Sequence, residues 1–375
     1  MGPSSPLGSR MSAHQPPPPS RSRAMGRVLA VVALGLAVVV GLGIAAQSLG
    51  AEASDGGLLE RLRLAPFALA VAAWWVASVL AGPRLVALLP PTQRAQAPAG
   101  WRLGLWMVGV HGLNLALPGP AGDLAFVGAL VRVHGLPARS VVAATTFARV
   151  GGLATIGLLG LAMLPFAPSG GPLGLVLRGA VACLALGAVA LGIGALRPGW
   201  LTWWSRGTVG WMAARAPGVL AGPLHRIDAG VAGLARGLAE VARGGPRAMA
   251  ITVGWSLLIQ AALATSLLAA AAAVGESLPL AGLPMAHVAG ELASVAVAVA
   301  PAGMGGFDGA LAASLLAFCG LGGLSSALVV LSIRSVQLVA LGGGTVAVAA
   351  AAPALFRGDG RGKSEDRSTS GPPEG

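Results

Sequence analysis

Five charged side chains stand within strongly apolar stretches of this sequence, and their chemistry is the first question it raises. Three are acids and two are arginines: Asp123, Glu291, Asp308, Arg149 and Arg334. If these stretches cross a membrane, each unpaired charge near the centre of a helix costs about 2.5–3.5 kcal/mol on insertion scales. We therefore expect the charges to pair across a helix bundle or to face a polar cavity, and we predict the pairs Asp123–Arg149 and Asp308–Arg334.

Two roles are open for these side chains. In one, they contact a polar headgroup or a coupling ion along a substrate path; in the other, they are structural ion pairs that fix helix register. His111, Asn114 and His287 lie near the same segments. A lone histidine within a membrane packs through hydrogen bonds more often than it relays protons. The candidates for a substrate path are Asp123, Arg149, Glu291, Asp308, Arg334, His111 and Asn114.

The two predicted pairs belong to two similar segments rich in proline and glycine. Residues 117–123 read Leu-Pro-Gly-Pro-Ala-Gly-Asp, and residues 300–308 read Ala-Pro-Ala-Gly-Met-Gly-Gly-Phe-Asp. A Gly-Ala-Leu triplet follows each segment, and an arginine within an apolar stretch closes each copy. The residues expected to break helices at membrane depth are Pro118, Gly119, Gly122, Pro301, Gly303, Gly305 and Gly306.

The apolar runs beside these breaks are too short for comfortable membrane spans. They cover residues 103–117, 124–133, 286–300 and 309–319. Short segments interrupted by Gly and Pro in corresponding places of two halves are typical of broken or re-entrant helices. If each hairpin enters and leaves on one side, the first is expected to open to the cytoplasm, because it is flanked by Arg102, Arg132 and Arg139. The second, flanked by Glu276, is expected to open to the outside. The sequence therefore predicts an inverted-topology repeat.

Composition sets the class of protein. Of the 375 residues, 55% are hydrophobic and 10% charged, whereas soluble domains carry about 25% charged residues. Six apolar stretches approach or exceed the roughly 20 residues that cross a bilayer as a helix: 28–49, 64–82, 140–164, 173–196, 249–274 and 324–352. We predict an all-α, polytopic membrane protein with about six full spans and two broken hairpins. The net charge of +12 is explained by cytoplasmic loops rather than by nucleic acid.

The distribution of charge predicts how the chain is divided into a leader, a membrane domain and a tail. Residues 1–26 form a basic, disordered cytoplasmic leader, residues 27–355 the membrane domain, and residues 356–375 a disordered cytoplasmic tail. The arginine-rich loop 197–248 and both termini are expected in the cytoplasm, and the protein in the cell (inner) membrane. A further cytoplasmic loop is predicted after the second span, with three arginines: Arg84, Arg94 and Arg102.

The motifs around Pro118 and Pro301 resemble those of the flippase-like transmembrane family that includes the membrane region of lysylphosphatidylglycerol synthases. In that family a Pro-Gly-x-x-Gly-acid motif precedes a helix with an arginine, as Pro118 to Asp123 precede Arg149 here. This chain departs from the pattern at Leu124, where a basic residue is usual, and in Phe147-Ala148-Arg149, where Glu-Arg is usual. The resemblance covers roughly residues 28 to 352 and implies movement of polar-headed lipids between leaflets.

We therefore expect a translocase, or flippase, for a polar-headed lipid or a lipid-linked saccharide. The alternatives are an ion-coupled transporter of a soluble solute and a non-transporting scaffold for envelope biogenesis. Catalysis is not expected, because the sequence has no His-Glu-x-x-His or Gly-x-Ser-x-Gly motif and lacks the aminoacyl-transfer domain of the synthases. Cys183 and Cys319 fit apolar packing, and neither a metal nor a cofactor is expected. The expected partners are membrane lipids, with envelope or glycolipid biosynthesis enzymes as further candidates, and no nucleic acid.

Overall fold

The computed structural model describes residues 62–116, 121–167, 171–197, 235–296 and 306–356, together with the single residues 199, 203, 207 and 232. Within this part all regular secondary structure is helical, which confirms the predicted all-α class. The predictions for the leader, the span at 28–49, the tail and most of the loop 197–248 lie outside the described residues.

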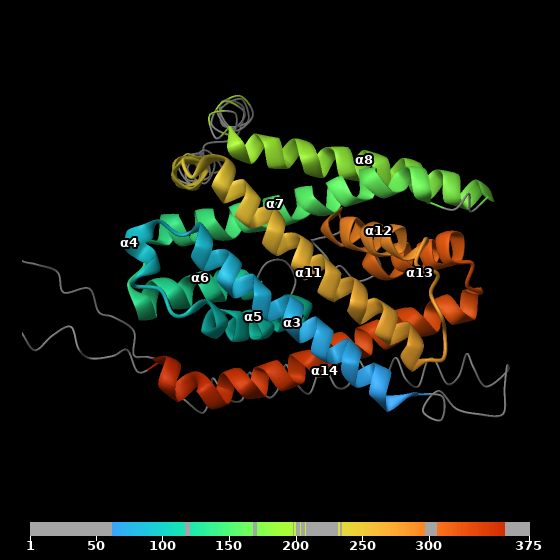
Figure 1. The fold of residues 1–375 in the computed structure, drawn as a ribbon. Helices are drawn as coiled ribbons and strands as arrows, with labels where there is room; N and C mark the ends of the chain where they lie inside the picture. Colours follow the sequence, from blue (N-terminus) through green and yellow to red (C-terminus); the bar gives the residue numbers. More distant parts are fainter. Residues whose placement is uncertain are drawn as a thin grey trace, which may run out of the picture.

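In the described part of the chain, five long helices form the frame of the bundle (Figure 1). Each is long and apolar enough to cross a membrane, and each matches a predicted span. They are α3 (Leu64–Leu88), α7 (Ala138–Met163), α8 (Gly171–Leu196), α11 (Gly245–Ala273) and α14 (Gly323–Phe356). A 3-10 turn, η1 (Leu164–Phe166), follows α7. Large apolar side chains such as Leu175 and Val176 remain exposed on α8, as suits a surface in contact with lipid.

Four shorter helices form two pairs, at the places where the sequence predicts hairpins. The first pair is α5 (Gly100–Ala116) with α6 (Ala121–His134), and the second is α12 (Leu283–Ala296) with α13 (Gly306–Cys319). With 14 to 17 residues each, they fall short of the roughly 20 needed to cross the hydrocarbon core. The connections 117–120 and 297–305, with Pro118, Gly119, Pro301, Gly303 and Gly305, lie outside the described residues.

The two pairs lie at opposite ends of the bundle (Figure 1). The α5/α6 pair lies beside the C-terminal end of α3 and the start of α7, and the α12/α13 pair lies beside the C-terminal end of α11 and the start of α14. Two long helices link them, because α14 packs against α5 and α13, and α7 packs against α6 and α12. A short helix, α4 (Pro91–Arg94), connects α3 to α5.

Glycines allow α3 and α5 to approach closely. A Cβ atom at Gly82 would clash with the backbone of Gly104, and one at Gly100 would lie 2.9 Å from the Cα atom of Pro83. Small residues four positions apart, such as Gly100 and Gly104, permit this kind of backbone contact between membrane helices. The contact fixes α5 against α3 and so positions the first hairpin.

The predicted boundary of the second span is wrong. The sequence predicts that this span ends at residue 82 and that Arg84 lies in a cytoplasmic loop, whereas α3 continues to Leu88 with Pro83 inside it. The physical reason is tertiary. Neighbouring helices can stabilise a proline within a membrane helix, and the Arg84 side chain finds a partner on α11, where its Nη1 donates to Ser256 Oγ at 3.1 Å.

Candidate functional site

The first predicted ion pair joins the first hairpin to a long helix. Asp123 lies in the first turn of α6, where the helix dipole favours a negative charge. Its carboxylate pairs with Arg149, which lies near the middle of α7. The predicted pair Asp123–Arg149 is confirmed.

The second predicted ion pair has the same construction. Asp308 lies in the first turn of α13, and Arg334 lies on the long helix that follows, α14. Nε of Arg334 donates to Oδ1 of Asp308 at 2.6 Å, and Nη2 donates to Oδ2 at 3.1 Å. A further bond joins Nη1 to Gln337 Oε1 at 2.9 Å, and the guanidinium lies 4.7 Å from the ring centre of Phe307. This pair is also confirmed, with the forked geometry that gives strong charge-assisted hydrogen bonds.

The two pairs differ in exposure. The side chain of Arg334 is 11% exposed and that of Asp308 is 30% exposed. In the first pair, Asp123 is 8% exposed but Arg149 is 50% exposed. An arginine half-exposed near the middle of a membrane helix is expensive in lipid, so we expect the exposed part of Arg149 to meet water or a polar group.

One of the expected path residues, Asn114, helps to position the first pair. Asn114 on α5 accepts a hydrogen bond from the backbone N–H of Gly122 at 2.7 Å through its Oδ1. This bond satisfies one of the free N–H groups in the first turn of α6. A Cβ atom at Gly122 would overlap the Val110 carbonyl and lie 2.7 Å from Asn114 Oδ1, so a glycine is required here. The contact at Gly122 fixes the start of α6, and Asp123 is the next residue of that helix.

His111 and Arg84 complete the surroundings of the first pair. His111 Nδ1 lies 3.0 Å from Ser78 Oγ, and its ring meets that of Trp74 edge to face, with the centroids 5.9 Å apart. Both His111 and Arg84 lie within electrostatic range of Arg149. We call Arg84, His111, Asn114, Asp123 and Arg149 the first cluster. Sequence analysis missed Arg84, although the apolar character of residues 85–89 was a signal that the helix continues past it.

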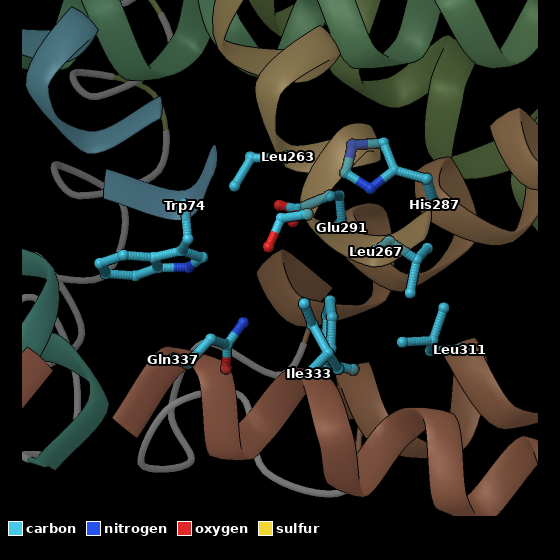
Figure 2. Close-up of a pocket in the computed structure, with 10 residues that line it drawn as sticks. Trp74, Leu263, Leu267, His287, Glu291, Leu311, Ile333 and Gln337 are labelled. Atoms are coloured by element: carbon cyan, nitrogen blue, oxygen red, sulfur yellow. The ribbon is translucent and has the colours of Figure 1, made fainter. Parts of the chain in front are cut away.

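The surroundings of the second pair include a small cavity (Figure 2). It has room for about one water molecule. Figure 2 shows the carboxylate of Glu291 in the middle of the lining residues, with Trp74 and Gln337 on one side and His287 on the other. His287 Nε2 lies 2.6 Å from Gln260 Oε1, and Glu291 lies within electrostatic range of Arg334. We call His287, Glu291, Asp308, Arg334 and Gln337 the second cluster.

The structure thus collects the expected polar residues in two clusters, each built on one hairpin and the long helices around it. Of the expected helix-break residues, Gly122 and Gly306 lie in the first turns of α6 and α13, and the others lie outside the described residues. Guanidinium and carboxylate groups at membrane depth suit charge-assisted hydrogen bonds to a polar or charged ligand. This is chemistry for binding a polar group inside the bilayer.

A comparison with known protein families finds a match over most of the chain. The family described as "Lysylphosphatidylglycerol synthase TM region" matches residues 31–343, which include every described helix from α3 to α13 and the first part of α14. A search of curated proteins finds no match.

Proposed function

Because this chain belongs to the lysylphosphatidylglycerol synthase TM-region family, we propose that it moves polar-headed lipids or lipid-linked saccharides between the two leaflets of its membrane. The observation that carries this proposal is the half-exposed side chain of Arg149 near the middle of α7. A flippase needs polar contacts at that depth, since a headgroup that leaves water must exchange hydration for hydrogen bonds.

The arrangement of the hairpins supports a path through the bundle. One short helix pair lies at each end, and each holds an acid in the first turn of its second helix. In transporters with inverted repeats, substrate sites lie near the midplane at the interface of the repeats. We propose that the headgroup passes between the two clusters while the acyl chains stay in lipid. The inverted repeat is part of this proposal.

A second candidate is an ion-coupled transporter of a soluble solute. The observation that favours it is the position of Glu291 in the small cavity beside His287 and the Asp308–Arg334 pair. Acid and histidine groups within membrane helices form coupling-ion and proton sites in secondary transporters. The two candidates differ in what crosses the membrane, so one reconstitution separates them.

The test is reconstitution of the purified full chain into liposomes. Fluorescently labelled lipids are added, and the fraction accessible to an external quencher is followed against protein-free liposomes. The proposal predicts protein-dependent exchange of lipid between leaflets without an imposed gradient. Solute uptake that depends on a proton or sodium gradient, without lipid exchange, would favour the second candidate. If the liposomes show neither lipid exchange nor solute uptake, that result would favour a non-transporting scaffold.

A further inference from the structure

Glu291 lies at a point where several helices of the bundle meet. It belongs to α12 and lines the small cavity of the second cluster, which has room for about one water molecule. The other lining residues come from α3, α11, α12, α13 and α14, and Figure 2 shows the Glu291 carboxylate in their midst. The cavity therefore gives water a place beside this carboxylate.

Two residues join the cavity to the Asp308–Arg334 ion pair. Gln337 lines the cavity, and its Oε1 accepts a hydrogen bond from Arg334 Nη1 at 2.9 Å. Phe307 also lines the cavity, and its ring centre lies 4.7 Å from the guanidinium of Arg334. Glu291 itself lies within electrostatic range of Arg334. The carboxylate in the cavity and the ion pair beside it therefore act on each other.

The charges of this group do not cancel when both acids are ionised. Asp308 and Glu291 supply two negative charges, whereas Arg334, which donates to both oxygens of Asp308, supplies one positive charge. The connection 297–305 has no charged side chain. A charge in excess is costly at membrane depth, and one proton on Glu291 removes it.

In the part of the chain that the structure describes, one further titratable side chain faces this cavity. It is His287 on α12, whose Nε2 lies 2.6 Å from Gln260 Oε1, a hydrogen bond that a neutral imidazole can make. The other charged or titratable residues of α3, α7, α8, α11 and α13 do not line the cavity: Arg84, Arg139, Arg149, Arg178, Arg247, Cys183 and Cys319. Glu291 and His287 are therefore the two groups beside the ion pair on which a proton can be sought.

We infer that Glu291 binds a proton, exchanged with water through this cavity, and that transport by the protein is coupled to the movement of that proton. A shift of the second hairpin against α3 or α14 changes the surroundings of Glu291, because all of these elements line the cavity. A group whose affinity for a proton differs between two arrangements of the helices couples proton binding to the change between them. This inference rests on the proposed function, because it names the ion that is coupled to transport along that path.

The cavity suits a proton better than a metal ion. Hard cations are bound by several oxygen ligands. Apart from Glu291, the lining residues with a side-chain oxygen are Ser266 and Gln337. The Ser266 hydroxyl donates to the Ala70 carbonyl at 2.9 Å, and Gln337 Oε1 accepts from Arg334. A proton, in contrast, needs just one carboxylate oxygen.

A pH gradient across liposomes that contain the purified full chain tests the inference. The probes are phosphatidylglycerol and glucosyl diacylglycerol, each with a fluorophore that does not titrate in the range used, and a potassium ionophore holds the membrane potential at zero. If one proton moves per lipid, a gradient of about one pH unit shifts the distribution of a translocated probe between the leaflets up to about tenfold. The reversed gradient should reverse the shift. An unshifted distribution, or a shift that follows a sodium gradient instead, would overturn the inference.

Variants then assign the proton to Glu291. We expect Glu291→Gln, which is neutral and of nearly the same shape, to lose the shift, and Glu291→Asp, which still titrates, to keep part of it. His287→Gln should keep its response to the pH gradient. Glu276→Gln is the matched control, because Glu276 follows α11, does not line the cavity and should behave as wild type. A full shift in Glu291→Gln, or a loss confined to His287→Gln, would overturn the assignment to Glu291.

Infrared difference spectra of the purified chain in detergent, between acidic and alkaline buffers, separate this inference from the proposed function. A protonated carboxyl group has a C=O stretch that a carboxylate lacks, so we expect a band that disappears in Glu291→Gln and stays in Glu276→Gln. That band, in a protein that exchanges no lipid in liposomes, would refute the translocase and keep the proton site. Lipid exchange without the band and without a response to the pH gradient would keep the translocase and refute the proton site.

Discussion

Arg149 and Arg334 occupy corresponding places, each on the long helix after a short pair and each paired with an acid of that pair. Their environments differ. Arg334 is held by both oxygens of Asp308 and by Gln337, with 11% of its side chain exposed, whereas Arg149 is half exposed. We therefore propose a mainly structural role for the Asp308–Arg334 pair and a role in ligand contact for Arg149.

The first prediction concerns the more enclosed ion pair, Asp308–Arg334. Asp308→Asn or Arg334→Gln leaves an uncompensated partner charge among buried groups, and such changes destabilise by up to about 3–5 kcal/mol. We expect each single variant to give much less folded protein, measured by size-exclusion chromatography in detergent. The double variant should recover yield, because no charge is then orphaned. Wild-type yield from both single variants would show that this pair is well solvated.

The second prediction concerns the ion pair Asp123–Arg149, whose arginine is half exposed. Removal of the Arg149 charge by Arg149→Gln leaves Asp123 without its ion-pair partner, whereas removal of the Asp123 charge by Asp123→Asn leaves the half-exposed Arg149 without its own. Because Asp123 is only 8% exposed, we expect Arg149→Gln to lower the folded yield by leaving a buried carboxylate unpaired. Asp123→Asn leaves the half-exposed Arg149 solvated, so its folded yield should stay within about twofold of wild type, and neither variant should exchange lipid in liposomes. Arg102→Gln is the control, because Arg102 is an exposed arginine of α5. Full exchange by Arg149→Gln would exclude this residue from the path.

At the scale of the elements, the start of α6 depends on close packing against α5. Gly122 donates its N–H to Asn114 and leaves no space for a side chain beneath the Val110 carbonyl. In contrast, a Cβ atom at Gly128 on the same helix would meet nothing within 4 Å. One helix thus contains a glycine required by packing and another that packing does not require.

The third prediction uses this difference. Gly122→Ala must separate α6 from α5 or shift Asn114, and overpacking of this kind typically costs about 1–3 kcal/mol. Gly128→Ala removes a weak helix former without a clash and should be neutral or slightly stabilising. We expect a lower melting temperature in detergent for the first variant only. Equal melting temperatures for the two would contradict the close approach of α5 and α6.

At the scale of the whole molecule, the two short pairs at opposite ends of the bundle imply a definite topology (Figure 1). If a short pair enters and leaves on the same side, the chain before α11 and the chain after α14 lie on one face of the membrane. The arginine-rich loop before α11 should hold that face in the cytoplasm.

The fourth prediction tests this topology with reporter fusions. A reporter fused after Arg247 and one fused after Arg357 should both show a cytoplasmic position. The reason is that α11 and α14 each cross the membrane once, while α12 and α13 between them enter and leave on the same side. A fusion after Glu276, which follows α11, should show the outer side. Opposite locations for the fusions at Arg247 and Arg357 would mean that α12 and α13 together cross the membrane once.

The amino-acid sequence by itself determined the class of the protein, the long helices, the two short pairs and the two ion pairs. These follow from local quantities: the length of an apolar run decides whether it can cross a bilayer, and charges within such runs need partners wherever the helices pack. Tertiary structure decided which side chains surround each pair. Arg84 lies in the first cluster because it donates to Ser256 on α11 and because Gly152 on α7 leaves space for its guanidinium. The residues next to Arg84 in the sequence indicate neither contact. Likewise, the exposure of Arg149 and the enclosure of Arg334 depend on helices far away in sequence, since burial is a property of all the atoms around a side chain.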